Sequence, residues 1–458
     1  MRHFDLAVIG TGSGNTLVTK RMNEWSVAIL ERGTFSGTCL NVGCIPTKMF
    51  EYTAELAQGT TDAARFGVDA TLDKVHWAQI RDRIFGRIDP ISASGREYRL
   101  GPRTPNVTLY EGTARFVGPK TLDTGTGETV TADRIVIAAG SRPVIPPIPG
   151  LVTVEYHTSD TVMRLDELPP RIVIVGGGYI AAEFGHIFAS LGSTVSQLSR
   201  GPRLLKHQDR EVSDTFTSAV GQRYDVRLST KACGVSRDER GIVVEVEGPD
   251  GRGEVIADVL LLATGRTPNT DLLDPAAGGV DLHPDGRVKV DEFQRTNVDG
   301  VFALGDISSD WQLKHVANAE ARTVAYNLLH PQDLVATDHR FVPSAVFAWP
   351  QIATVGLSEE QAQERGVAYV VGKRDYAGVA AGWAREEPVG FAKVLADPDT
   401  GRLLGAHVIG PEAATVIQPA IQALSFGQTV RELTRGQYWI HPALPEVLEN
   451  ALIEAEHA

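Results

Sequence analysis

The sequence is poor in cysteine, with only Cys39, Cys44 and Cys233 among its 458 residues. A structural zinc site needs about four Cys or His ligands at short spacings. No second Cys or Cys/His cluster exists, so the sequence predicts no metal site. A chain of this length buries several cores without covalent staples, which excludes a disulfide-stabilised scaffold. Cys233 stands alone and is interpreted as an ordinary residue of a strand region.

Long apolar runs are also missing. No stretch reaches the roughly 18 apolar residues that suggest a membrane-spanning helix, and the N-terminus leads into a strand rather than a signal peptide. The net charge is −13, and the sequence contains no run of Lys or Arg that would make a local basic patch. The electrostatic field of this negative charge opposes binding to nucleic acid. These absences predict a cytoplasmic protein that binds neither membranes nor nucleic acid.

Glycine, by contrast, is plentiful, and two glycine-rich turns each stand in the same strand–turn–helix–strand pattern. The first turn follows an apolar strand at 4–9 and contains Gly10, Gly12 and Gly14. A helix and a second strand at 26–30 are expected to follow, ending at Glu31. In such a unit the first glycine makes a sharp bend, the second lets the backbone approach a pyrophosphate, and the acid binds ribose hydroxyls. Asn15 replaces the usual third glycine, and a lone Gly-x-Gly also fits an ordinary tight turn.

The second unit matches the dinucleotide fingerprint fully. It runs from a strand at 171–175 through a turn and helix to a strand at 194–198, and its turn residues are Gly176, Gly178 and Ala181. Two units of this kind indicate two dinucleotide sites.

The second unit ends in basic residues, at the position where a carboxylate would select NAD. Ser199 and Arg200 stand there, and Arg203 and Lys206 follow. Positive charge at this point suits the 2′-phosphate of NADPH. The alternative is a solvated basic loop.

The segment 37–48 carries the candidate chemistry. Cys39 and Cys44 lie five positions apart, so two thiols can meet across a distorted helical turn. Disulfide exchange needs an attacking thiolate and a resolving thiol within bonding distance. In a reducing compartment such a pair is more often catalytic than structural. A zinc site or two buried free thiols are the alternatives.

Other patterns outline the rest of the chain. Apolar residues recur at helical spacing over 75–88, and this pattern ends before Pro90. Residues 106–139 have the turns of a β-meander. From about residue 341 strands and helices mix without a third glycine fingerprint, which predicts an interface domain.

Together, the segment from Cys39 to Lys48, both glycine turns and the tail resemble the pyridine nucleotide–disulfide oxidoreductase family, over essentially the whole chain. The resemblance implies an α/β fold with two Rossmann-like nucleotide-binding domains, each a doubly wound parallel sheet with a β-meander, and a C-terminal α+β dimerisation domain. It divides the chain into an FAD-binding domain at 1–148 and 271–338, an NADPH-binding domain at 149–270 and a dimerisation domain at 339–458.

The resemblance also assigns roles around the cofactors. On the FAD side it adds Thr38, Lys48, Ala139, Gly140 and Asp306 to the first turn and Glu31. On the NADPH side it adds Tyr179, Glu183 and Arg266 to the second turn, Arg200 and Lys206. Asp306 would bind the ribityl chain, and Lys48 would lie beside flavin N5 with Glu183 as its carboxylate partner. Tyr179 would cover the flavin until the nicotinamide displaces it.

The tail matches the family motif in which His441 is the acid–base and Glu446 orients it. In the family this histidine reaches the cysteines of the other subunit, which implies a homodimer. A histidine near neutral pKa serves such proton transfer. Leu444 and Pro445 stand where the family has small polar residues, a departure at the substrate cleft.

The expected activity is NADPH-dependent reduction of a small disulfide. The Gly12–Asn15 turn and the Tyr438–Pro442 segment resemble the mycothione-reducing branch of the family. Glutathione disulfide and lipoamide are the alternative substrates. No cysteine follows Cys233, which disfavours mercuric reductases and the large thioredoxin reductases. A different class, a flavoprotein that senses nucleotides without turnover, is disfavoured by the intact cysteine pair and His441.

Overall fold

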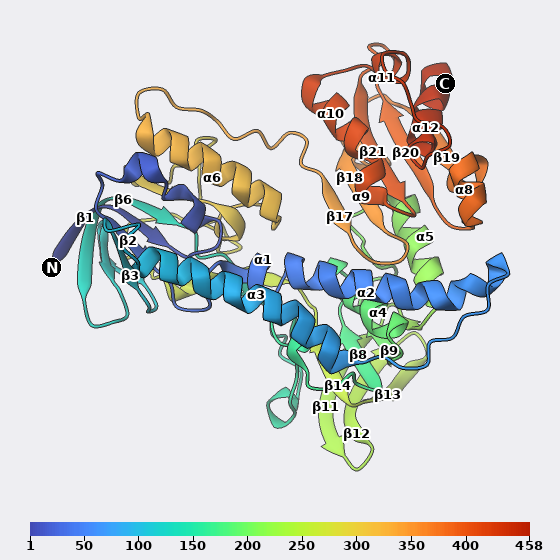
Figure 1. Ribbon diagram of the computed structural model, residues 1–458, viewed down its shortest axis with the longest axis horizontal. Helices are drawn as coiled ribbons and strands as arrows, with labels where there is room; N and C mark the ends of the chain where they lie inside the picture. The colour runs from blue at the N-terminus through green and yellow to red at the C-terminus, as the bar shows by residue number, and fades with distance from the viewer.

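The computed structural model describes residues 1–458, which fold into three lobes. Figure 1 shows the N-terminal lobe at the left, the central lobe at the lower right and the C-terminal lobe at the upper right. None of the helices combines the length and apolar character that a bilayer crossing requires.

The N-terminal lobe is built on a seven-stranded sheet. Its strands are β1 (Arg2–Ile9), β2 (Val27–Leu30), β3 (Val107–Tyr110), β4 (Arg115–Gly118), β5 (Thr121–Asp123), β6 (Thr129–Ile137) and β16 (Val301–Ala303). The order is β3-β2-β1-β6-β5-β4, and β16 pairs with the end of β6. Strands β1, β2, β3, β6 and β16 are parallel and largely buried, as parallel strands covered on both faces must be. Strands β4 to β6 are antiparallel and confirm the predicted meander.

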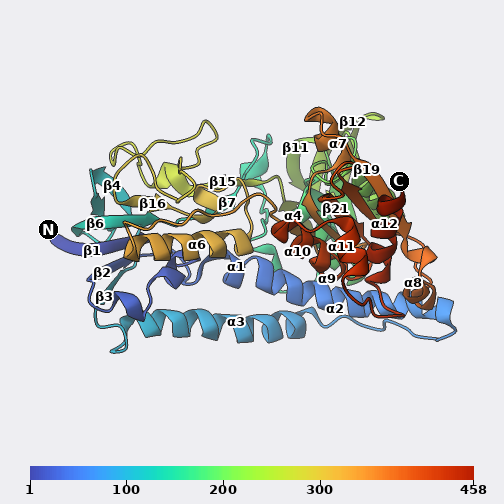
Figure 2. The same ribbon diagram turned by 90° about the horizontal axis from the view of Figure 1, so that it is seen from above.

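Helices and loops cover both faces of this sheet. One face packs on α6 (Lys314–Leu329), and the other packs against the segment 273–307. The short helix α1 (Gly37–Asn41) leads into α2 (Cys44–Asp62), which lies beside α3 (Trp77–Leu100). Figure 1 shows α2 and α3 extending from this lobe towards the other two, with α2 between the C-terminal and central lobes in this view, and Figure 2 shows both helices along one side of the molecule.

Helix α3 continues beyond Pro90, so the prediction that the helical pattern ends there was wrong. Proline inside a helix removes one hydrogen bond and costs about 3 kcal/mol. Tertiary contacts on both sides of the proline offset this cost. Ile84 and Ile88 are buried before it, and the Ser92 hydroxyl beyond it donates to the Phe35 carbonyl at 2.6 Å.

The helix expected after the first glycine turn is replaced by two short 3-10 helices, η1 (Gly14–Leu17) and η2 (Lys20–Met22). The reason lies in α3. The buried guanidinium of Arg99 donates to the carbonyls of Asn15 and Val18 at 2.7 and 3.0 Å, and to the Asn15 side chain at 2.8 Å. These bonds satisfy carbonyls that a longer helix would pair internally.

The central lobe contains a four-stranded parallel sheet in the order β10-β9-β8-β14. Its elements are β8 (Arg171–Val175), α4 (Tyr179–Ser190), β9 (Thr194–Leu198), α5 (Arg210–Gly221), β10 (Asp225–Arg227) and β14 (Val259–Leu262). An antiparallel sheet of β11 (Lys231–Asp238), β12 (Gly241–Gly248) and β13 (Gly251–Ala257) packs beside it. This is the second doubly wound unit that the sequence predicted, with Cys233 in β11.

The chain crosses twice between these two lobes. Strands β7 (Ser141–Pro143) and β15 (Arg266–Pro268) pair antiparallel at this crossing. The expected domain boundaries at 148, 270 and 338 remain predictions.

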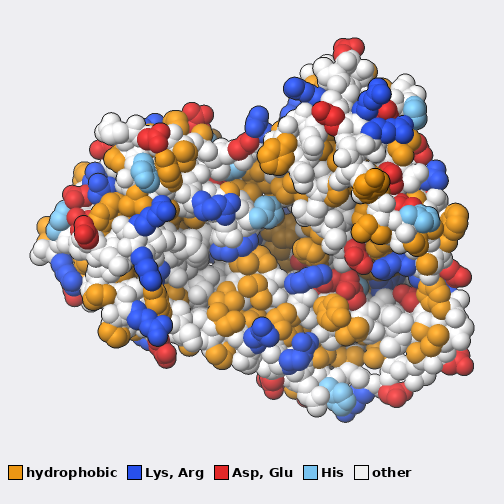
Figure 3. Space-filling model, turned by 45° about the horizontal axis from the view of Figure 1, so that its top comes forward, with side chains coloured by type: hydrophobic (Ala, Val, Ile, Leu, Met, Phe, Trp, Pro, Cys, Tyr) orange, Lys and Arg blue, Asp and Glu red, His pale blue; other side chains and the backbone are white.

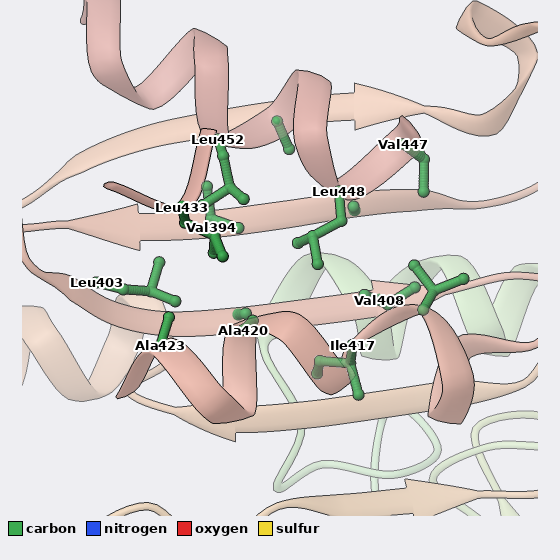
Figure 4. Packing of buried hydrophobic residues seen from close by; sticks show 14 of the residues in the cluster. Val394, Leu403, Val408, Ile417, Ala420, Ala423, Leu433, Val447, Leu448 and Leu452 are labelled. Carbon is green, nitrogen blue, oxygen red and sulfur yellow. The ribbon is translucent and has the colours of Figure 1, made fainter. Parts of the chain in front are cut away.

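The C-terminal lobe is α+β. Its antiparallel sheet has the order β17-β18-β21-β20-β19, with β17 (Ser344–Val346), β18 (Ile352–Gly356), β19 (Val370–Asp375), β20 (Phe391–Ala396) and β21 (Leu403–Ile409). Its helices are α7 (Glu359–Glu364), α8 (Ala380–Arg385), α9 (Ala413–Val416), α10 (Gln418–Phe426), α11 (Val430–Arg435) and α12 (Glu446–His457). Side chains of α10 and α12 meet those of β20 and β21 in one core (Figure 4). Other residues of this sheet pack on α5 of the central lobe.

Candidate active site: a cysteine pair between two glycine-rich turns

The two cysteines lie at the junction of α1 and α2. Cys39 is in α1, and Cys44 is the first residue of α2. Both are free thiols, and they are close enough to hydrogen-bond to each other. The turn before them is held by Asn41, whose amide donates to the carbonyls of Phe35 and Gly37, each at 2.8 Å. The five-residue spacing therefore brings the thiols together, as predicted.

The surroundings favour ionisation of one sulfur. The Cys44 thiol donates to Cys39 and lowers the pKa of Cys39 to about 7; the charge of Lys314 and the backbone N–H groups of Cys44 and Ile45 act in the same direction. The same shared proton, together with burial, raises the pKa of Cys44. The reduced pair thus holds a nucleophile that is partly ionised at neutral pH.

The first glycine turn lies at the C-terminal end of β1. Gly10 has φ +100°, and a Cβ there would collide with the Ala138 carbonyl of the neighbouring strand. Beyond the turn, Glu31 accepts from the Thr11 backbone N–H at 2.8 Å and from its hydroxyl at 2.6 Å, and from Gly33 at 2.8 Å. The acid at the end of β2 is thereby fixed beside the turn. Each carboxylate oxygen retains acceptor capacity for a further donor.

Asp306 joins this site from the loop after β16. Its Oδ2 accepts from the Ser141 hydroxyl at 2.6 Å. The same hydroxyl accepts from Arg266 Nε at 2.8 Å, which places the Arg266 guanidinium 4.0 Å from Asp306. Asn269 donates to Ala139 and Gly140, so the strand end that carries both is fixed. Arg266, assigned to the NADPH side, therefore also contacts the FAD-side residues.

The second turn repeats the geometry of the first. Gly176 has φ +155°, and a Cβ there would collide with the Ala263 carbonyl. Gly178 precedes the N-terminus of α4, and a Cβ there would meet no atom within 4 Å. The backbone at Gly178 thus borders open space beside the N-terminus of α4, as a bound pyrophosphate requires.

The predicted cations lie directly beside this turn. The Leu205 N–H donates to the Gly177 carbonyl at 2.7 Å, which ties the loop after β9 to the turn. Arg200 and Lys206 on this loop are exposed and pair with no carboxylate within 4.0 Å. Arg203 Nε is buried without a hydrogen-bond partner. Such a donor set fits a phosphate group.

Lys48 pairs with Glu51 rather than with Glu183, which corrects the expected ion pair. Lys48 Nζ lies 2.5 Å from Glu51 Oε2, one turn along α2, and 4.4 Å from the ring centre of Phe347. The Glu51 carboxylate is fully buried and needs a cation. Glu183 instead accepts the Phe347 N–H at 3.0 Å. Burial raises the pKa of Glu51 to about 7 and that of Glu183 to about 8.

A cavity of about 580 Å³ is lined by Cys44, Lys48, Tyr52 and Phe347, among others. Figure 3 shows that the surface of the molecule is hollowed between its lobes. Tyr179 is the first residue of α4 and is partly exposed; burial of its hydroxyl raises the pKa of Tyr179 to about 12. The groups whose charges reach that hydroxyl include Arg266, Asp306 and Cys44, so the two nucleotide units converge on the cysteine pair.

His441 and Glu446, the predicted acid–base pair, contact each other on the C-terminal lobe. The His441 Nδ1 lies 2.6 Å from Glu446 Oε1, and Glu446 Oε2 accepts the Ala443 N–H at 3.0 Å. The His441 side chain is 70% exposed. Leu444, part of the departure from the family motif, is buried in the lobe's core, and Pro445 stands at the N-cap position of α12 without a side-chain hydrogen bond. Burial of Leu444 therefore anchors the segment that leads into the helix carrying Glu446.

Sequence reasoning missed four residues of this site. Glu51, Arg99, Asn269 and Lys314 act through contacts with segments far along the chain or one helical turn away, and none belongs to a motif. Glu51 alone had a local signal, since it stands three residues after Lys48 on a helix.

Comparison with known proteins matches two family models to the chain. Residues 4–321 match the family described as pyridine nucleotide-disulphide oxidoreductase, and residues 342–452 match its dimerisation domain. Mycothione reductase from Mycobacterium tuberculosis is 52% identical over 99% of each chain. Glutathione reductase from Burkholderia cepacia is 34% identical over 97% of each chain. The HOCl-induced flavoprotein disulfide reductase RclA from Escherichia coli is 27% identical and superposes with a TM-score of 0.86, covering 98% of this chain and 99% of RclA.

Proposed function

Because the chain belongs to the pyridine nucleotide-disulphide oxidoreductase family, we propose that it reduces mycothione, the disulfide of mycothiol, with electrons from NADPH. It is an FAD-dependent disulfide oxidoreductase, and its C-terminal region is a dimerisation domain. The choice of mycothione is carried by the similarity to the Mycobacterium tuberculosis enzyme, which is greater than that to the Burkholderia cepacia glutathione reductase. Membership of an enzyme family removes the support for a sensor without turnover.

The residues around the first turn fit FAD. The N–H groups of Gly12, Ser13 and Gly14 would bind the pyrophosphate, and the Glu31 carboxylate would bind the adenosine ribose. Asp306, whose second oxygen accepts no hydrogen bond from the protein, is available to the ribityl hydroxyls. Bound at these residues, FAD would supply the redox chemistry that links hydride transfer from NADPH to two-electron reduction of the cysteine pair.

The second turn fits NADPH. Gly178 leaves open space beside the N-terminus of α4, where backbone N–H groups would bind the pyrophosphate. Arg200, Arg203 and Lys206 supply three cations for a 2′-phosphate, and none of them is neutralised by a carboxylate within 4.0 Å. This supports NADPH over NADH.

The cysteines then carry out disulfide exchange. The Cys39 thiolate attacks one sulfur of mycothione, forms a mixed disulfide and releases one mycothiol. Cys44 attacks the Cys39 sulfur of that adduct, releases the second mycothiol and closes the Cys39–Cys44 disulfide. Two electrons and two protons restore the thiols. Ionisation of Cys39 near neutral pH supports its role as the attacking sulfur.

His441 donates the proton that the first departing thiolate needs, and Glu446 holds its ring. In one subunit His441 lies shortly before α12 on the C-terminal lobe, its side chain is exposed, and no hydrogen bond joins it to either cysteine. We assign this step to the partner subunit's His441, which makes the active site a property of the dimer. The enzyme works in the cytoplasm, where a small thiol pool is kept reduced.

A turnover panel tests the proposal. Purified holoenzyme is assayed with mycothione, glutathione disulfide and lipoamide, each with NADPH and with NADH. Mycothione with NADPH is expected to give a kcat/KM at least about 100-fold above that of any other pair, roughly 2.7 kcal/mol of discrimination. Cys39→Ser and Cys44→Ser are expected to abolish turnover. Preference for glutathione disulfide, or full activity of either serine variant, would overturn it.

A further inference from the structure

Leu205 lies in the loop after β9 with a backbone conformation that a leucine rarely adopts. Its φ is +52°, in the left-handed region where the Cβ of an L-residue crowds the following carbonyl oxygen. Such a conformation persists only where the surrounding contacts enforce it. The next residue is Lys206, one of the exposed cations assigned to the 2′-phosphate of NADPH. The strained position therefore lies within the loop that is proposed to select the cofactor.

The side chain of Leu205 is held in a core that joins two lobes. It is 5% exposed, and its neighbour Leu204 is fully buried. The Leu205 N–H also donates to the Gly177 carbonyl at 2.7 Å. The same core contains four residues from the sheet of the C-terminal lobe, which are Val346, Ile352, Phe391 and Ile409. Packing against that lobe thus opposes relaxation of the strained backbone.

A buried ion pair holds the other end of this loop. Asp209 is the N-cap residue of α5, and its two carboxylate oxygens lie 3.1 and 3.2 Å from Nζ of Lys393 on β20. Both side chains are buried. Between the two anchors, the Gln208 N–H donates to the Leu205 carbonyl at 2.9 Å. The C-terminal lobe therefore fixes the loop on both sides of Lys206, whose own side chain is exposed.

The φ of Leu205 determines where Lys206 is presented. Rotation from +52° to an ordinary negative value would redirect the chain that follows and move the Lys206 ammonium. The second glycine turn depends less on this bond, because Gly176 directly follows β8 and Gly178 is the N-cap residue of α4. Strand pairing and helix hydrogen bonds also hold that turn. Relaxation at Leu205 should therefore weaken contacts with a 2′-phosphate more than contacts with the pyrophosphate.

We propose that Leu205 is a positioning residue for the selection of NADPH over NADH. Its side chain, anchored in the core shared with the C-terminal lobe, keeps the strained turn that presents Lys206 to the 2′-phosphate. The dimerisation domain thereby contributes to cofactor specificity through packing. The inference rests on the proposed use of NADPH and is independent of the disulfide substrate.

Equilibrium binding tests this role without turnover. The Kd values of NADP⁺ and NAD⁺ are measured on the oxidised FAD holoenzyme by isothermal titration calorimetry. Leu205→Ala removes the anchor and leaves the unfavourable φ, so the Kd of NADP⁺ is expected to rise about 10-fold and that of NAD⁺ less than about 2-fold. Leu205→Met keeps the buried volume and should retain both wild-type values. Leu433→Ala, which truncates a buried leucine of α11 outside this core, is the matched control and should also retain both.

Two further variants separate backbone strain from a general loss of packing. Glycine adopts a positive φ without steric cost, so Leu205→Gly should bind NADP⁺ more tightly than Leu205→Ala does. Leu205→Val keeps most of the buried volume, but its β-branched side chain disfavours a positive φ further, so its Kd should rise for NADP⁺ alone. This variant decides the question if Leu205→Ala does not fold.

Three results would overturn the inference. They are an equal rise of both Kd values in Leu205→Ala or Leu205→Val, wild-type values in both variants, and binding of NADP⁺ by Leu205→Gly no tighter than by Leu205→Ala. The wild-type enzyme tests the underlying function separately. If it bound NADP⁺ and NAD⁺ alike, the proposed use of NADPH would itself be contradicted, and this inference with it.

Discussion

The Nδ1 atom of His441 lies 2.6 Å from Oε1 of Glu446, and this contact determines how the histidine ring is presented. Glu446 is the first residue of α12, and its other oxygen is held by the Ala443 N–H. A carboxylate on one ring nitrogen fixes the tautomer and directs the second nitrogen outwards. In the proposed dimer, Nε2 of this exposed side chain would face the cysteine pair of the other subunit.

Glu446→Ala should therefore reduce the rate of the disulfide-exchange half of the reaction. We expect kcat for mycothione to fall about 100-fold, because general acid–base catalysis is worth roughly that much or more. The KM for NADPH should stay unchanged, since Glu446 is on another lobe. Steady-state kinetics measures both values. Glu449→Ala, one turn further along α12, is the control; an equal loss in that variant would point to damage to the helix.

Mixed dimers can show whether the histidine acts across the interface. Neither Cys39→Ser nor His441→Ala should be active as a homodimer. A heterodimer of the two contains one site with an intact cysteine pair from one subunit and an intact histidine from the other. We expect coexpressed, differently tagged subunits to recover activity at one site per heterodimer. An inactive heterodimer would mean that each His441 serves its own chain.

The cofactor preference should depend on the cations after β9. Arg200→Gln combined with Lys206→Gln is expected to raise the KM for NADPH at least about 10-fold, because each charge-assisted hydrogen bond to a phosphate is worth about 1.5–3 kcal/mol. The KM for NADH should change less than about 2-fold, as it has no 2′-phosphate. Arg210→Gln at the start of α5 is the control for a general loss of positive charge. Equal effects on both cofactors would contradict the assignment.

The parts of this structure that the sequence predicted are those whose physical requirements are local. The bend at Gly10 and the spacing of Cys39 and Cys44 can be recognised from a few neighbouring residues, and the buried parallel strands from their apolar runs. The errors arose where distant contacts outweigh local preference. The Arg99 guanidinium donates to the Asn15 carbonyl, which a helix extending from Asn15 would otherwise pair internally. The two residues are far apart in the sequence.

The partner of Lys48 shows the same limit. The resemblance paired it with Glu183, but Glu51 lies nearer on the same helix and has no other cation. Lys48 pairs with Glu51, while the other buried acid, Glu183, accepts a hydrogen bond from the Phe347 N–H. No pattern in the sequence indicates that second contact. Lys314 was missed for a similar reason, because its partner Ser13 is brought near only by the packing of α6 on the first sheet.

The stability of the fold should depend on one buried lysine between two lobes. Lys393 of β20 is 2% exposed, and its Nζ lies 3.1 Å from Asp209, which is fully buried at the start of α5; Glu211 and Glu359 also contact it. Removing one member of a buried ion pair leaves the other charge uncompensated and costs about 3–5 kcal/mol. We expect Lys393→Met to lower the thermal unfolding midpoint by several degrees or more, as measured by circular dichroism at pH 7.

A second change should reverse part of that loss. In Lys393→Met the uncompensated group is Asp209, and Asp209→Asn removes its charge while keeping an oxygen that can cap α5. The double variant should therefore be more stable than Lys393→Met alone.

The stability of the wild-type protein at acidic pH tests the same ion pair. Burial alone would raise the pKa of Asp209, but the charges of His407 and Lys393 hold it below 3.8. The stabilisation is then complete above pH 3.8 and is lost as the pH falls below it. An unfolding midpoint that Lys393→Met leaves unchanged would show that this ion pair does not hold the two lobes together.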